Sequence, residues 1–114
     1  PASLWDNATY SENTTLGQGS KILQIEVKAE DKSVVFTVKT DAEYLGQALL
    51  DNKLVEGEVA QYGLYIKSVN GIRADYDLDG AFWGLSKNGE YLMTGADQTV
   101  IADGEHYELT YTKG

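Results

Sequence analysis

The 114-residue sequence predicts a single α+β domain in which one helix packs across an antiparallel or mixed sheet. Three observations lead to this fold class. Several runs alternate apolar and polar residues, one helix-start pattern precedes apolar residues at helical spacing, and two Asn-Gly pairs separate β-rich runs. Hydrophobic residues make up 42% of the chain and charged residues 24%, which is enough apolar material for one core.

The first twenty residues differ in composition from the rest of the chain. They are polar and contain glycine without a sustained period, so we expect residues 1–20 to be a leader or linker and residues 21–114 to be the domain. Trp5 and Tyr10 are exceptions, because a large aromatic side chain in a polar stretch often covers a surface. These two residues could pin the segment onto the domain.

Two neighbouring runs, residues 21–29 and 33–39, have the period of two that is typical of strands with one buried face. The polar turn Glu30-Asp31-Lys32 separates them, so the runs predict a β-hairpin. The apolar positions, which share one face in each run, are Leu23, Ile25, Val27, Val34, Phe36 and Val38.

A helix is expected directly after the hairpin. Thr40-Asp41-Ala42-Glu43 matches the capping box, in which a Thr hydroxyl and a Glu carboxylate satisfy free N–H groups at a helix start. Apolar residues then recur at helical spacing up to Asn52, and Gly57 is a stop signal beyond them. The apolar face of this helix must pack on the sheet.

The second half of the chain predicts further strands at residues 62–69, 81–87, 91–94 and 106–112. The pairs Asn70-Gly71 and Asn88-Gly89 lie between these runs, and Asn-Gly favours the tight type I′ turn of a hairpin. A hairpin, a helix and then more strands is the order of a β-grasp-like domain.

Composition excludes several classes of function. The formal net charge of −9 repels phosphate backbones and anionic lipid headgroups, which argues against nucleic-acid and membrane-surface binding. The chain has no cysteine, which excludes disulfides, thiolate zinc sites and cysteine nucleophiles. No apolar run is long enough for a transmembrane helix, and no signal segment is present in this chain.

The most specific chemical motif is Asp75-Tyr76-Asp77-Leu78-Asp79-Gly80, which matches the opening of an oxygen-rich calcium loop. We expect the carboxylates of Asp75, Asp77 and Asp79 to bind a cation, calcium before magnesium. The shell would be completed by acids elsewhere, with Asp97, Asp103 and Glu90 as candidates. The alternative is a solvated acidic turn, because Asp favours turns by bonding its own backbone.

His106 is the only histidine, and His106-x-Glu108 places a histidine and a carboxylate on one face of a strand. This pair could be half of a transition-metal site, although a half-exposed strand histidine is the more ordinary interpretation. No nucleophile-elbow or phosphate-loop motif is present. We therefore expect a protein that is not an enzyme.

Aromatic residues crowd the second half of the chain, and Tyr76, Phe82, Trp83 and Tyr91 are the candidate ligand-binding residues. At a period of two some of them must face outward, and exposed Tyr or Trp beside polar groups is typical of platforms for flat ligands, sugars or peptides. The alternative is that these side chains form the core and rim of a small sheet.

A combination of motifs carries a resemblance to a known family. The motifs are Leu45-Gly46-Gln47-Ala48-Leu49, Gln61-Tyr62-Gly63-Leu64-Tyr65, Val69-Asn70-Gly71, Asp75 to Trp83, Asn88-Gly89-Glu90-Tyr91 and Tyr107 to Lys113. Together they cover residues 22–113, and the chain resembles the transcobalamin-like C-terminal domain family. The resemblance implies a soluble-ligand-binding β-grasp-like domain of secreted or surface-attached bacterial proteins.

The resemblance also sets an expectation about the ligand. The vertebrate carriers that share the domain have a large helical domain that supplies much of the cobalamin site, and nothing in this chain could form it. Cobalamin is therefore not the expected cofactor, and the acidic motif makes calcium the expected one. The expected function is an extracellular, non-catalytic, metal-binding module, with small-ligand binding or a structural, adhesive role at the bacterial surface as the alternatives.

Overall fold

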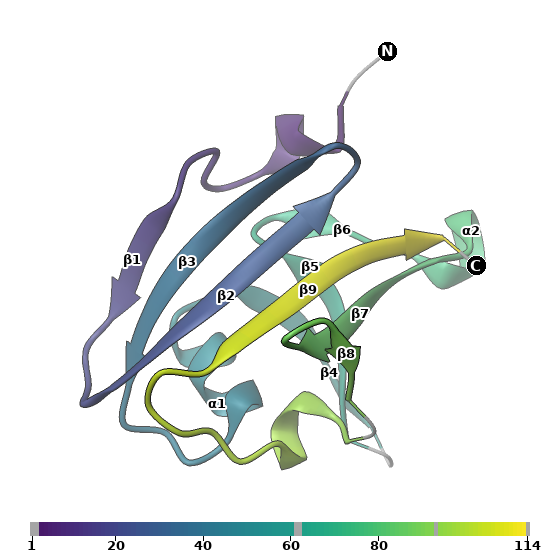
Figure 1. The fold of residues 1–114 in the computed structure, drawn as a ribbon. Coiled ribbons are helices and arrows are strands. Elements are labelled where there is room, and N and C mark those ends of the chain that lie inside the picture. The colour runs from purple at the N-terminus through teal and green to yellow at the C-terminus, as the bar shows by residue number, and fades with distance from the viewer. Residues whose placement is uncertain (1–2, 61–62, 93, 114) are drawn as a thin grey trace.

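The computed structural model describes residues 3–60, 63–92 and 94–113, which form two sheets and four short helical segments. Figure 1 shows the larger sheet in front of α1 and the smaller sheet. The larger, six-stranded sheet has the order β1 (Thr14–Gly17), β3 (Lys32–Thr40), β2 (Lys21–Ala29), β9 (His106–Lys113), β7 (Ala81–Lys87) and β8 (Glu90–Tyr91). The smaller sheet has the order β4 (Val55–Ala60), β5 (Gly63–Val69) and β6 (Ile72–Arg73).

The helical segments are η1 (Leu4–Asn7), α1 (Leu45–Asp51), α2 (Tyr76–Asp79) and η2 (Ala96–Gln98). Within the described part of the chain, no helix is long and apolar enough to cross a membrane. The α+β class and the mixed sheet are as the sequence predicts.

The predicted hairpin is confirmed, and it supplies one wall of the core. β2 and β3 are antiparallel, with Ile25 opposite Phe36, and both side chains are fully buried. β9 lies beside β2 in parallel, and β7 pairs with β9 in antiparallel. Because side chains alternate across a strand, one face of this sheet is buried under α1 and the smaller sheet, and the other face is open.

The predicted start of the helix is wrong. Thr40 does not cap a helix but ends β3, where it is paired with Lys21 across the hairpin. Its hydroxyl accepts a hydrogen bond from the backbone N–H of Ala42 at 3.0 Å. Continued strand pairing therefore wins over the capping box, and α1 begins at Leu45 and buries its apolar face as expected.

The interpretation of Gly57 as a helix stop is also wrong, because Gly57 lies inside β4, a strand that the sequence did not predict. The register shifts beside it, and a Cβ at this position would run into the carbonyl oxygen of Tyr65 on β5. Only glycine allows the two backbones to approach so closely. β4 therefore depends on this residue.

The later strands follow the prediction with small differences at their ends. β7 has the predicted bounds, β5 and β9 agree within a residue at each end, and β8 is only Glu90–Tyr91. Tyr62, the predicted start of one strand, and Met93, inside another, lie outside the described residues, while the predicted end at Thr94 is not in a strand.

The polar segment before Lys21 contacts the sheet. Trp5 Nε1 donates a hydrogen bond to the backbone oxygen of Ala29 at 2.9 Å, and the ring of Tyr10 packs edge-on against Phe36 with 5.8 Å between centroids. β1 then pairs in parallel with β3. The expected pinning role of Trp5 and Tyr10 is confirmed, while the domain boundary at residue 20 stays a prediction.

Candidate functional site

An apolar groove of about 450 Å³ lies where the two sheets meet. β5 supplies one wall, β7 the other, and α2 and the segment that leads into η2 close the ends. The two sheets meet here because β5 of the smaller sheet packs against β7 of the larger one. The lining residues are Leu64, Tyr65, Ile66, Tyr76, Phe82, Trp83, Leu85, Thr94, Gly95 and Ala96.

Trp83 forms a fixed, largely covered part of the groove. Its side chain is 7% exposed, and its Nε1 donates a hydrogen bond to the backbone oxygen of Ile72 at 3.1 Å. Tyr111 packs edge-on against the indole at 5.6 Å, and burial, with the nearby charges of Asp79 and Glu30, raises the pKa of Tyr111. Trp83 therefore belongs to the core and the groove at once.

Tyr65 and Tyr76 form the rim of the groove, since 45% and 59% of their surfaces are exposed. Both side chains also line a neighbouring hollow of about 450 Å³ with a polar wall. Lys67, Arg73 and Asp75 belong to that wall. Arg73 Nη2 lies 3.5 Å from Asp75 Oδ2, and Lys67 Nζ lies 3.1 Å from Oε1 of Glu58, which is outside the hollow. An apolar groove and a charged hollow thus adjoin at two tyrosines.

The structure gathers three of the four predicted ligand-binding residues. Tyr76, Phe82 and Trp83 line the groove, whereas Tyr91 lies on β8 beside a separate hollow with Lys87, Asn88, Glu90 and Leu92. Sequence reasoning did not single out Tyr65. Tyr65 is one of the many aromatic residues in the second half of the chain, and this was its sequence signal. Its neighbours Phe82 and Trp83 in the groove come from the other sheet, so the sequence did not show that the three residues meet.

The acidic motif forms a helical turn in place of an open loop. Asp75 is the N-cap of α2, where its Oδ1 accepts hydrogen bonds from the N–H groups of Asp77 at 3.1 Å and Leu78 at 3.2 Å. Gly80 ends the turn in the left-handed conformation with φ of 66°. A helical turn advances about 100° per residue, so Asp77 and Asp79 within α2 point to opposite sides of the turn.

The expected calcium shell is not assembled in this conformation. Asp97 lies in η2, Glu90 lies in β8, and Asp103 Oδ1 accepts the N–H of Ile22 at 2.7 Å. Across residues 3–60, 63–92 and 94–113, no three or more Asp, Glu, His or Cys side chains are arranged as a ready metal-binding group. The assignment of Asp75, Asp77 and Asp79 as calcium ligands stays a prediction.

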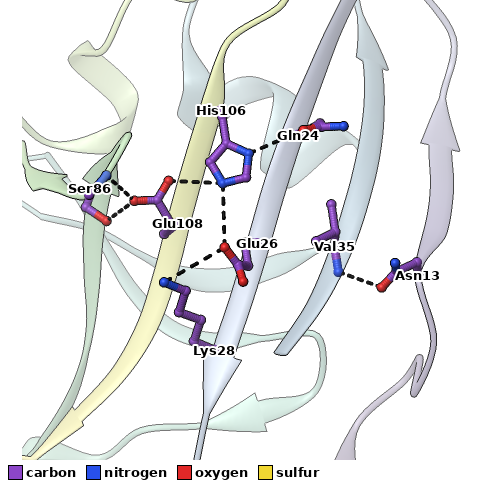
Figure 2. Close-up of polar contacts among 9 residues, drawn as sticks. Asn13, Gln24, Glu26, Lys28, Val35, Ser86, His106 and Glu108 are labelled. Atoms are coloured by element: carbon purple, nitrogen blue, oxygen red, sulfur yellow. Dashed lines mark hydrogen bonds and ion pairs between the residues drawn. The ribbon is translucent and has the colours of Figure 1, made fainter. Parts of the chain in front are cut away.

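A second polar cluster lies on the open face of the larger sheet (Figure 2), around His106. The parallel register of β2 and β9 sets Gln24 beside His106 and Glu26 beside Glu108. His106 Nε2 lies 3.2 Å from Glu108 Oε2 and 3.6 Å from Glu26 Oε1, and its Nδ1 lies 3.4 Å from Gln24 Oε1. The sequence pointed to His106 and Glu108, but the contribution of β2 was missed.

Comparisons with known proteins fit this architecture. Human Transcobalamin-1 is 29% identical over 107 residues, which are 94% of this chain and 21% of that protein, so the chain spans about a fifth of this relative. A crystal structure of a candidate metal-binding protein from Ruminococcus gnavus is 41% identical, with a TM-score of 0.79 over 83% of this chain and 99% of that one.

Haptocorrin in complex with Cbi shares the fold, with a TM-score of 0.64 and 23% identity over 85% of this chain and 26% of that one. The resemblance to a transcobalamin-like domain is therefore confirmed. Residues 43–113 match the family described as "Domain of unknown function (DUF4430)", and the chain belongs to that family.

Proposed function

We propose that this domain is a non-catalytic, extracellular binding module that holds a small, flat and amphipathic ligand in the groove between β5 and β7. The observation that carries the proposal is the meeting of the apolar groove with the charged hollow at Tyr65 and Tyr76. Aromatic walls bind flat apolar surfaces, and the adjacent Lys67 and Arg73 can receive polar or anionic substituents.

Four further facts bear on the proposed function. Transcobalamin-1 is a relative by sequence, and haptocorrin, which shares the fold, was solved in complex with Cbi. The β3-β2-β9-β7-β8 order around a hairpin and helix supports the β-grasp-like assignment. The net charge of −9 disfavours nucleic acid as the partner.

A ligand panel read by tryptophan fluorescence tests the groove. The chain has two tryptophans, so the Trp5→Phe variant leaves Trp83 as the reporter. Titration with corrinoids, other tetrapyrroles and planar aromatic acids is expected to change Trp83 emission for at least one class. Tyr65→Ala and Tyr76→Ala should each weaken that binding about fivefold, since a lost aromatic contact costs about 1 kcal/mol.

Tyr91→Ala is the matched control, because Tyr91 is 66% exposed and lies outside the groove. The Tyr91→Ala variant is expected to bind the ligand with the same affinity as the unchanged chain. A panel without any fluorescence response, or an equal loss in the Tyr91 variant, contradicts the groove as the ligand site.

Calcium at Asp75, Asp77 and Asp79 is the second candidate function. It is supported by the acidic motif itself and by the description of the Ruminococcus gnavus relative as a candidate metal-binding protein. Calcium binding would require the α2 turn to open, because Asp75 now caps it. Isothermal titration should give heat that Asp77→Asn abolishes, and no heat at millimolar calcium rules this candidate out.

A further inference from the structure

The cluster around His106 contains two carboxylates, Glu26 and Glu108, whose negative charges a bound cation would compensate. Glu26 and Glu108 are direct neighbours on β2 and β9, and like charges at such positions repel. Glu108 is only 3% exposed, which adds the cost of removing a carboxylate from water. Lys28 Nζ is 3.8 Å from Glu26 Oε1, and it is 46% exposed. This lysine therefore compensates the outer carboxylate more than the buried one.

The two oxygens of Glu108 have different surroundings. Oε1 accepts hydrogen bonds from the Ser86 hydroxyl at 2.8 Å and from the Gly89 N–H at 2.7 Å. Oε2 is buried and has no hydrogen-bond donor in the described part of the chain. It faces His106 Nε2 at 3.2 Å, as Figure 2 shows. One oxygen thus fixes the carboxylate, and the other is aimed at the imidazole.

The imidazole of His106 has the orientation typical of a metal ligand, with one ring nitrogen near a hydrogen-bond acceptor and the other facing carboxylates. With its proton on Nδ1, His106 donates toward Gln24 Oε1, and the Nε2 lone pair then faces both carboxylates. In that state, a lone pair and two negatively charged oxygens face one another, and they repel unless a cation lies between them. Either a proton on Nε2 or a metal ion meets that need.

We propose that Glu26, His106 and Glu108 form a site for a transition-metal ion of the zinc class, on the opposite face of the sheet from α1. Zinc binds nitrogen and carboxylate oxygen at about 2.0–2.2 Å, so two of its ligands lie roughly 3.4 Å apart. The distances of 3.2 Å and 3.6 Å from Nε2 to the two oxygens bracket that spacing. Imidazole also selects zinc, nickel and copper over calcium.

The three proposed ligands, Glu26, His106 and Glu108, do not yet surround one point. We expect the side chain of Glu26 to move when the metal ion binds. Its side chain is 23% exposed, and its partners in the structure are Lys28 and His106. Ser86 and Gly89 hold Glu108 in place. The side chain of His106 is 33% exposed, so an ion can enter from solvent and keep water as a further ligand.

The test uses the tag-free chain, stripped of metal by chelation, at pH 7.5. Because His106 is the only histidine, its two carbon-bound ring protons give one set of imidazole NMR signals, which reports on this site alone. Zinc is expected to shift these signals, and cobalt(II) to shift and broaden them. The melting temperature should rise by about 5 °C or more at saturating zinc.

His106→Gln and Glu26→Gln are the site variants, and Asp31→Asn, at an exposed turn residue outside both candidate metal sites, is the control. We expect His106→Gln to abolish the zinc-dependent melting shift, Glu26→Gln to weaken zinc binding about tenfold or more, and Asp31→Asn to leave it unchanged. Unmoved imidazole signals with zinc, nickel and cobalt at 1 mM overturn the proposal. An undiminished melting shift in His106→Gln overturns it too.

Discussion

Asn70 joins the turn between β5 and β6 to the N-terminal segment at Tyr10 through one side chain. It has φ of 52° in the turn between β5 and β6, and it is 2% exposed. Its Oδ1 accepts the N–H of Tyr10 at 2.9 Å, and its Nδ2 donates to the oxygen of Tyr10 at 2.8 Å. Asn70→Ala should lower the free energy of unfolding by about 2–3 kcal/mol, which urea denaturation measures.

Asn88→Ala is the control for that change. Asn88 has the same kind of turn conformation, with φ of 51°, but it is exposed. Its replacement removes the left-handed preference alone and should cost about 1 kcal/mol. Equal losses in the two variants would show that the bonds to Tyr10 contribute nothing.

Glu105 makes stability depend on acid. Burial alone would raise its pKa, but hydrogen bonds from Lys87, the Ala102 N–H and the Tyr107 hydroxyl outweigh burial and lower it. A carboxyl with a lowered folded pKa adds stability above its ordinary pKa of 4.5, and that stability is lost as the pH falls through the folded value.

The prediction is a pH-dependent difference between the unchanged chain and Glu105→Gln. The variant should be less stable by about 1–2 kcal/mol at pH 7, and the gap should narrow at about pH 3. Urea melts at both pH values measure it, with the exposed Asp31→Asn as control. A gap that widens in acid contradicts this account.

Substitutions in the α2 turn distinguish a helix-capping role of Asp75 from a metal-binding role. Asp75→Ala removes the acceptor for two N–H groups and should cost about 1 kcal/mol in chelated protein. Asp75→Asn should cost little, because Asn is an equally good N-cap. Asp77→Asn should also be neutral without metal. If Asp75→Asn and Asp75→Ala are equally destabilised in urea, Asp75 is not acting as a cap.

The sequence predicted helices, strands and turns correctly where a local pattern is compatible with only one structure. Alternation in β2 and β3 predicts a strand because one face is buried, and Asn70-Gly71 predicts a turn because both residues need positive φ. It failed where tertiary pairing decided. Thr40 could cap a helix or extend a strand, and pairing with Lys21 chose the strand. Gly57 is explained only by its contact with β5.

The candidate sites follow the same division. Tyr76, Phe82 and Trp83 were suggested by aromatic crowding, and their convergence with Tyr65 needed the packing of two sheets. His106 and Glu108 are two residues apart on one strand, so the sequence brought them together. Glu26 joins them only through the parallel register of β2 and β9, which no local pattern reveals.

At the scale of the molecule, residues 3–17 behave as part of the fold. They contribute the Trp5 bond to Ala29, the Tyr10 contacts and the pairing of β1 with β3. A chain that begins at Gln18 should therefore lose about 3 kcal/mol or more of stability. Differential scanning calorimetry measures the loss, and a synthetic 1–17 peptide added in trans should restore part of it. A chain from Gln18 that melts like the unshortened chain would support the linker interpretation.

The central place of β9 has a consequence for the order in which the fold can form. β9 lies between β2 and β7, so before it is added the larger sheet exists only as β1-β3-β2 and β7-β8. Residues 106–113 must emerge from the ribosome before these two halves can join. Until then, β2 in one half and β7 in the other are uncovered sheet edges, and β9 later covers both. Folding during synthesis is therefore delayed to the last strand, and a premature stop shortly before it yields a chain that cannot complete its core.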